Sequence, residues 1–253
     1  MNFQNTSKSA AAFFLLTLLS VPAMAHNLWI ETAPTGKVGQ SQAVHVYLGE
    51  YAYGVRENIQ EHSKEVGPIT LSLIKPNGEV IELKTTINGN HFTAEFTPEE
   101  QGHYQLALSV TKAPVVDWRE YNLGILKTNF FGSATVRVGN PDGANSSIKA
   151  STSGKELVIQ PVQSTSLKRQ SPIQFKVTYK GKPLAEQEVK VGYKDQWFKT
   201  LYTDDEGLIT VSLPWEGQFV IETVYTEETT GTFQGDDYEA IRQTATFNIP
   251  AVQ

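Results

Sequence analysis

The sequence predicts an all-β protein made of two tandem antiparallel β-sandwich domains behind a cleaved signal peptide. Short runs that alternate apolar and polar residues recur along the chain, and Gly, Pro and Asn separate them, which is typical of antiparallel sandwiches. A polar, turn-rich stretch divides these runs into two series. The expected divisions are a signal peptide at 1–25, an N-terminal sandwich at 26–140, a linker at 141–154 and a C-terminal sandwich at 155–253.

The first series of strands is expected at residues 42–48, 69–73, 79–83, 91–96, 104–110 and 135–138. Asn77 and Gly78 lie between the second and third of these runs, and such a pair between alternating apolar runs is a strong hairpin signal. No amphipathic helix of four turns is evident, but a short helical piece is expected at 55–64 or 117–123.

The second series is expected at residues 157–161, 172–179, 188–193, 200–202, 208–213, 217–225 and 244–249, with a turn at 203–207. Three short patterns in this half, at 181–189, 203–207 and 214–219, resemble those of small seven-stranded modules of the prealbumin-like or carboxypeptidase-regulatory type. The resemblance implies an immunoglobulin-like or prealbumin-like sandwich, and it implies nothing about activity.

Composition limits the classes of function. The chain has 253 residues, of which 40% are hydrophobic and 19% charged, and its formal net charge is −6. An acidic balance argues against nucleic acid as a partner. Cysteine is absent, which excludes disulfides, thiolate metal sites and cysteine catalysis. No apolar run after residue 25 is long enough to span a bilayer, so no membrane span is expected in the mature chain.

The first 25 residues have the layout of a bacterial secretory signal peptide. A polar start containing Lys8 precedes an apolar stretch at 10–21, and small residues follow at Ala23 and Ala25. Cleavage after Ala25 would make His26 the new N-terminus. We therefore expect an exported, periplasmic protein.

An N-terminal histidine is a ready chelate for a divalent metal ion. Its imidazole is the commonest metal ligand in proteins, and its α-amine, with a reference pKa of about 7.7–8.0, loses a proton at modest cost near neutral pH. Both nitrogens of His26 can reach one ion, and Cu(II) and Ni(II) favour nitrogen-rich sites. The alternative is that His26 is merely the residue that follows the cleavage site.

Further ligands are expected in the first domain, where all the histidines lie: His26, His45, His62, His91 and His103. His45 alternates with valines in its strand and should point away from the core. Gly49 allows a bend that presents Glu50. The expected site is His26 with His45 and Glu50, and His103 and His62 are reserve ligands.

Motifs for catalysis are missing from the sequence. There is no Gly-x-Ser-x-Gly elbow, no phosphate-binding glycine loop, no dinucleotide fingerprint and no His-Glu-x-x-His. The acidic run at 204–206 lacks the ligand spacing of a calcium loop and predicts a solvated turn, as does the pair at 236–237. One enzymatic alternative remains, because copper polysaccharide monooxygenases also begin with a mature histidine.

The opening His-Asn-Leu-Trp-Ile-Glu of the mature chain resembles the start of an exported family named NikM-like, or nickel-uptake-transporter-like, and largely of unknown function. Further matches are the step at Gly49 and Glu50, the turn at 76–78 and Gly102 two residues before Tyr104. The resemblance implies a periplasmic metal-binding accessory to nickel or cobalt uptake.

The sequence therefore predicts a periplasmic accessory that binds a transition-metal ion. Ni(II) is favoured, Cu(II) and Co(II) are alternatives, and a membrane or outer-membrane metal transporter is the expected partner. No reaction is expected to be catalysed. Two alternatives stay open: a structural or protein-binding β-sandwich module, and a copper-dependent oxidoreductase in which two histidines brace the metal.

Overall fold

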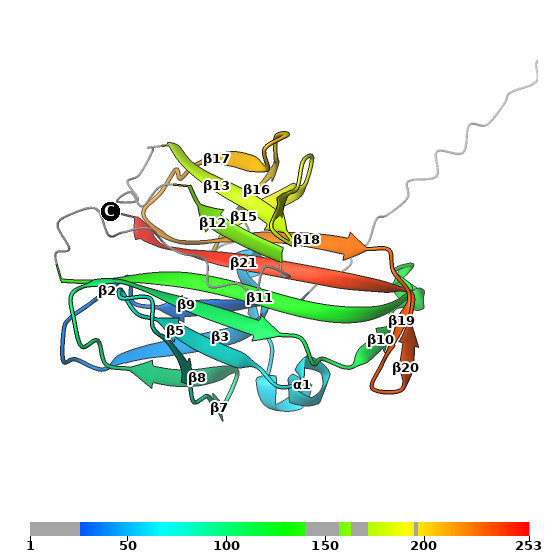
Figure 1. Ribbon diagram of the computed structural model, residues 1–253, viewed down its shortest axis with the longest axis horizontal. Helices are drawn as coiled ribbons and strands as arrows, with labels where there is room; N and C mark the ends of the chain where they lie inside the picture. The colour runs from blue at the N-terminus through cyan, green and yellow to red at the C-terminus, as the bar shows by residue number, and fades with distance from the viewer. Residues whose placement is uncertain (1–25, 140–156, 163–171, 195–196, 253) are drawn as a thin grey trace, which may run out of the picture.

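A computed structural model describes residues 26–139, 157–162, 172–194 and 197–252 of the chain. The predicted signal peptide at 1–25 and the predicted linker at 141–154 lie outside the described residues. Strands dominate the described part, and most of them form three stacked sheets (Figure 1). The all-β, sandwich-like prediction is confirmed.

The first sheet, sheet A, is built entirely from the N-terminal half of the chain. Its strands are β1 (Asn27–Thr32), β3 (Gln42–Glu50), β8 (His91–Phe96), β7 (Thr86–Asn88) and the short β4 (Val55–Arg56), which pairs with the end of β3. All pairings are antiparallel. Along β3, Val44, Val46 and Leu48 are buried, and His45 and Tyr47 between them are partly exposed, as the alternation predicts.

The second sheet, sheet B, has ten strands and includes both halves of the chain. Eight of its strands follow one another in the order β16 (Trp197–Tyr202), β15 (Glu188–Tyr193), β18 (Gly217–Glu227), β21 (Ala240–Val252), β11 (Ile125–Val138), β9 (Gly102–Val110), β5 (Thr70–Ile74) and β6 (Val80–Leu83). The two short strands β10 (Val115–Asp117) and β2 (Thr35–Gly36) pair with β11. The two halves meet where β11 and β21 pair in parallel over nine residues each. The sequence predicted neither this junction nor its parallel direction.

The third sheet, sheet C, lies in the C-terminal half. It contains β12 (Leu157–Pro161), β13 (Pro172–Tyr179), β14 (Lys182–Pro183) and β17 (Leu208–Ser212). A separate hairpin of β19 (Gly231–Phe233) and β20 (Asp236–Tyr238) projects from one end of the molecule (Figure 1).

Helical structure is short in the described residues. The α-helix α1 covers Ile59–Val66, and two 3₁₀ turns, η1 (Tyr51–Tyr53) and η2 (Arg119–Tyr121), flank strands. These segments fall in or beside the two stretches where a helical piece was expected. Asn58 caps α1 by accepting a hydrogen bond from the Gln60 backbone N–H at 3.1 Å, which satisfies one of the free donors of the first turn.

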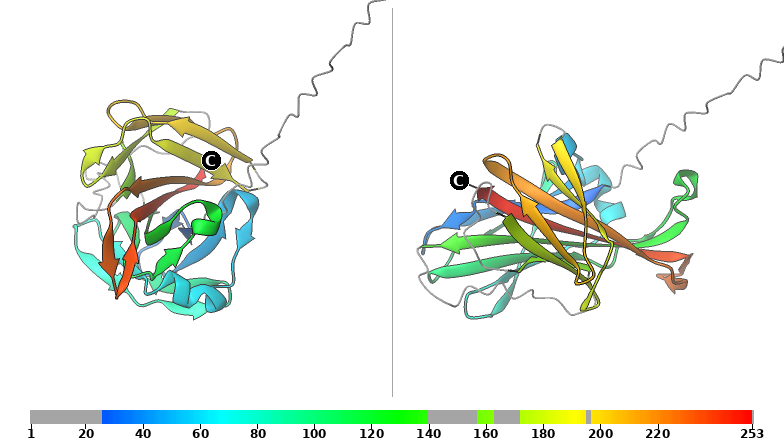
Figure 2. Two further views of the ribbon diagram at one scale, coloured as in Figure 1. Left: turned by 90° about the vertical axis from the view of Figure 1, so that its right-hand side faces the viewer. Right: turned by 90° about the horizontal axis from the view of Figure 1, so that it is seen from above.

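Two hydrophobic cores lie on opposite faces of sheet B. The adjacent residues Phe130 and Phe131 of β11 show this, because Phe130 packs against the N-terminal core and Phe131 against the C-terminal core. Sheet A covers the first core and sheet C covers the second, and the end-on view in Figure 2 shows β21 between the two halves. The central sheet is thus shared by both sandwiches.

The predicted hairpin at residues 75–78 is confirmed by the register of β5 and β6. Ile74 pairs with Val80, the Gly78 backbone N–H donates to the Lys75 carbonyl at 2.9 Å, and the Asn77 side chain accepts from the Glu79 N–H at 2.8 Å. The acidic run at 204–206 also forms a turn, in which the Asp204 carboxylate accepts from two backbone N–H groups. Within the described residues, no helix is long and apolar enough to cross a membrane.

Candidate functional site

The candidate site lies where the mature chain would begin. The His26 imidazole Nε2 is 3.2 Å from Glu57 Oε1, and the other oxygen of the same carboxylate is 3.8 Å from His62 Nε2. His62 Nδ1 in turn lies 3.0 Å from Glu65 Oε2. One carboxylate therefore stands between two imidazoles, and all three side chains are about one-third exposed, at 27–35%.

The end of β3 brings these side chains together. Asn27 of β1 pairs with Gly49 on one side of β3, and Arg56 of β4 pairs with the same Gly49 on the other. Gly49 has φ +142°, and a Cβ there would lie 2.2 Å from the Val55 carbonyl oxygen, so only glycine allows β4 this close. Glu57 then bonds through its backbone N–H to the Leu48 carbonyl at 2.9 Å, which places it beside His26.

The surroundings of this cluster are acidic. The Glu65 carboxylate at hydrogen-bond distance raises the pKa of His62 above its ordinary value, and the nearby charges of Glu57 and Glu61 add to that effect. Carboxylates at this density favour a positive charge between them, whether a proton on imidazole or a bound cation.

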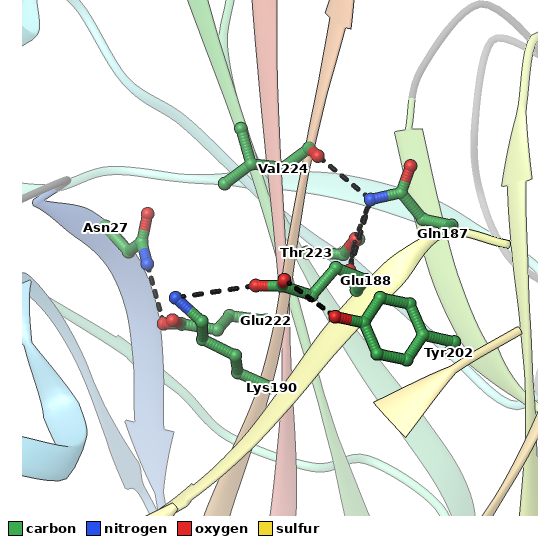
Figure 3. A network of polar contacts seen from close by, with 8 residues as sticks. All are labelled: Asn27, Gln187, Glu188, Lys190, Tyr202, Glu222, Thr223 and Val224. Atoms are coloured by element: carbon green, nitrogen blue, oxygen red, sulfur yellow. Dashed lines mark hydrogen bonds and ion pairs between the residues drawn. The ribbon is translucent and has the colours of Figure 1, made fainter. Parts of the chain in front are cut away.

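A second group of polar side chains lies on the other side of the start of β1. Asn27 Nδ2 donates a hydrogen bond of 2.6 Å to Glu222 Oε2 on β18, as Figure 3 shows. Burial raises the pKa of Glu222, and the charge of Glu50 acts in the same direction, so these two carboxylates are close. Lys190 opposes the shift and lies 3.6 Å from a Glu188 oxygen. This group connects the N-terminal strand to the C-terminal half.

Two acceptor atoms in this second group lack a donor. Asn27 Oδ1 and Glu50 Oε1 are buried and have no hydrogen-bond partner among the described residues. A buried polar atom without a partner costs about 1–3 kcal/mol, which makes each position receptive to a donor or a cation. Because Gly49 pairs with Asn27, Glu50 lies beside position 26 in the register of the two strands.

The structure thus brings three of the five predicted ligands to one end of sheet A: His26, His62 and Glu50. His45 pairs with Glu31, which is five residues along β1 from His26, or about 17 Å at 3.4 Å per residue. Its ring instead contacts His91, with the ring centroids 4.6 Å apart.

His103, the fifth predicted ligand, lies in sheet B. It belongs to β9 and pairs with Arg137 of β11. Glu57, which sequence reasoning missed, occupies the position between the two imidazoles. In the sequence, only its position in the same charged segment as His62 could have suggested that Glu57 belongs to the site. Within the described residues, no three His, Asp or Glu side chains are already arranged to hold a metal ion.

We expect His103 to titrate below its ordinary pKa of 6.5. Burial lowers the pKa of His103, and the positive charge of Arg137 lowers it further. The folded protein then binds this proton less tightly than the unfolded chain, so His103 makes the free energy of unfolding fall as pH drops below 6.5. NMR titration of the His103 ring protons measures the pKa directly.

The matched variant for that titration is Arg137→Gln, which should raise the pKa of His103 only part of the way, because burial is the larger cause. A wild-type midpoint at or above 6.5, or no movement in Arg137→Gln, would contradict the assignment.

Comparisons with known proteins place the chain in a family. Among solved structures, a crystal structure of InlP from Listeria monocytogenes matches at 19% identity and covers 42% of this chain and 25% of that chain. Its TM-score of 0.24 is too low to indicate a shared fold. No curated protein matches. A family model described as a domain of unknown function, DUF4198, matches residues 23–227, and the chain therefore belongs to the DUF4198 family.

Proposed function

We propose that this protein binds a transition-metal ion at its processed N-terminus. Ni(II) is the favoured ion, and Cu(II) and Co(II) are alternatives. In this proposal the protein is a periplasmic accessory that holds the ion for a membrane or outer-membrane transporter and catalyses no reaction. The resemblance of the opening hexapeptide to NikM-like proteins supports the proposal, and the DUF4198 family leaves the activity open.

The observation that carries the proposal is the contact of His26 and His62 with the two oxygens of Glu57. Two imidazoles and one carboxylate at the same place are suitable ligands for a borderline divalent ion. These partly exposed side chains would have to rotate to bring their ligating atoms onto one ion. The α-amine of His26, once freed, would add a fourth ligand.

The buried acceptors beside position 26 favour that amine. In the full-length chain the His26 nitrogen is part of a peptide bond with Ala25, so it carries one hydrogen and no charge. After cleavage it would be an ammonium or an amine with additional donors, next to Glu50, whose Oε1 has no partner among the described residues. The site is therefore complete only in the processed protein.

Direct binding tests the proposal. The protein beginning at His26 is dialysed against Ni(II), Cu(II) and Co(II) in turn, and bound metal is quantified in the wild type, His26→Gln and Glu57→Gln. We expect the wild type to bind with higher affinity than either variant, with a loss of at least about tenfold for His26→Gln, since removal of even an outer partner of a metal ligand costs about 10–100-fold.

His103→Gln is the matched control, because it removes a histidine from the other side of the N-terminal core and should leave this binding unchanged. Equal metal affinity in the wild type, His26→Gln and Glu57→Gln would reject the proposal.

A second candidate function is a protein-binding module, and one observation favours it. Aromatic side chains are exposed along β16 at the edge of sheet B: Phe198 is 47% exposed, and its ring centroid lies 6.1 Å from that of the equally exposed Tyr53. Exposed aromatic residues are enriched at protein interfaces. If the processed protein binds none of the three metals, this function is favoured.

A further inference from the structure

The exposed face of sheet A carries a pair of touching histidines. His45 pairs with Thr93 across β3 and β8, and His91 pairs with Tyr47, so the two histidines are diagonal neighbours on the sheet. Their ring centroids are 4.6 Å apart and the rings are nearly perpendicular, at 89°. Both side chains are partly exposed.

We propose that His45 and His91 form a second, separate binding site for a divalent metal ion of borderline softness, such as Cu(II), Zn(II) or Ni(II). Imidazole nitrogen is a suitable ligand for each of these ions. Two side chains from neighbouring strands of one sheet are already held together, so little conformational freedom is lost when both bind the same ion. Water or another exchangeable ligand would complete the coordination.

The hydrogen bonds of the pair support ligation. His45 Nδ1 is buried and has no hydrogen-bond partner among the described residues, which leaves a polar atom unsatisfied at a cost of about 1–3 kcal/mol. His91 Nδ1 lies 3.1 Å from Asn90 Oδ1. If that nitrogen carries the proton, the Nε2 of His91 has a free lone pair, and the Asn90 amide orients the ring as outer partners of metal-binding histidines do.

The charges around the pair permit a bound cation. Burial lowers the pKa of His91, and a positive charge on His45 would lower it further, which favours the neutral imidazole that binds a metal ion. Arg56 also lowers the pKa of His91, and its guanidinium pairs with the Glu31 carboxylate at 2.7 Å. Glu31 acts on the pKa of His91 in the direction opposite to Arg56, so its charge offsets part of the repulsion that a bound cation would meet.

This second site is independent of the proposed N-terminal one. It uses different side chains and needs no free α-amine. Along the strand direction His45 lies about 17 Å from position 26 and His91, which is level with Trp29, about 10 Å. Failure of one site therefore leaves the other testable.

The test uses a chain with one extra Met before position 26 that also carries His26→Gln and His62→Gln, so that neither the α-amine nor the two imidazoles of the proposed N-terminal site can bind. This protein is titrated with Cu(II), bound copper is measured by equilibrium dialysis, and pulsed EPR counts the coordinating imidazoles. We expect one bound copper with two imidazole ligands. In the same background His91→Gln should weaken that binding at least about tenfold, by the scale known for perturbed metal sites.

Two comparisons make the result decisive. His103→Gln removes a histidine outside the pair and should change nothing, and far-UV circular dichroism checks that every variant is folded. His91 lies at the first residue of β8 and is partly exposed, so His91→Gln should fold even if His45→Gln does not. Copper binding that survives His91→Gln, or an EPR signal with fewer than two imidazoles, would overturn the proposal.

Discussion

Placing one extra residue before His26 should weaken metal binding by the processed protein by about 100-fold, the upper end of what loss of an outer partner costs a metal site. The extension converts the α-amine into an amide nitrogen, which loses its basic lone pair, while the His26 imidazole and its neighbour Glu57 remain. The measurement is the dissociation constant for Ni(II) and Cu(II) of the two proteins under identical buffer conditions.

Comparing the extended chain with His26→Gln separates the contribution of the His26 α-amine to metal affinity from that of the His26 imidazole. That variant keeps the free amine and loses the imidazole, and the extended chain does the reverse. If the extended chain binds as tightly as the chain beginning at His26, the α-amine is not a ligand. A site made of His26, Glu57 and His62 side chains alone would then be the remaining form of the proposal.

Trp29→Ala should lower the free energy of unfolding by about 3–5 kcal/mol, the usual cost of removing a large buried aromatic side chain. Trp29 is 1% exposed and stacks on Tyr47, with ring centroids 5.7 Å apart, and meets the edge of Tyr51 at the same distance. Its indole N–H donates to Glu31 Oε1 at 2.8 Å. Urea denaturation followed by circular dichroism measures the loss.

The position of Trp29 also predicts an effect on the site. β1 is fixed to sheet B through hydrogen bonds that its Leu28 and Ile30 carbonyls accept from Thr246 and Asn248 of β21. A loosened β1 would no longer hold His26 beside Glu57, so Trp29→Ala should weaken metal binding as well as stability.

Two variants control for the stability effect. Trp29→Phe keeps most of the ring packing and loses only the hydrogen bond to Glu31, so its loss should be smaller. Trp215→Ala removes a tryptophan that is 44% exposed and should cost less than Trp29→Ala. Equal losses at Trp29 and Trp215 would contradict the anchoring role of Trp29.

The sequence predicted local structure well where the pattern was periodic and the turn chemistry was distinctive. The runs at 91–96, 157–161, 172–179 and 188–193 coincide with strands β8, β12, β13 and β15. β1 was not predicted as a strand, because residues 27–30 are all buried and do not alternate. Both of its faces are covered, one by the N-terminal core and the other by Tyr47, Tyr51 and the C-terminal half.

The candidate site was predicted only in part. The sequence pointed to His26 through the expected cleavage site and to Glu50 through the bend expected at Gly49, because both signals come from neighbouring residues in the chain. It could not tell that Glu57 would lie between His26 and His62, because that contact depends on the close approach of β4 to the end of β3. It expected His45 at the same site, whereas the strand register pairs His45 with Glu31 and sets it beside His91.

The sequence by itself determined the all-β class, most of the strands and the hairpin at 75–78, because alternation and turn residues are properties of neighbouring residues. The tertiary structure decided that one sheet joins both halves through the parallel pairing of β11 and β21, and which histidines meet. The junction depends on pairing between segments more than 100 residues apart and on the apolar surface that both cores bury against the shared sheet. The meeting of the histidines depends on strand register, which the local pattern of the sequence does not fix.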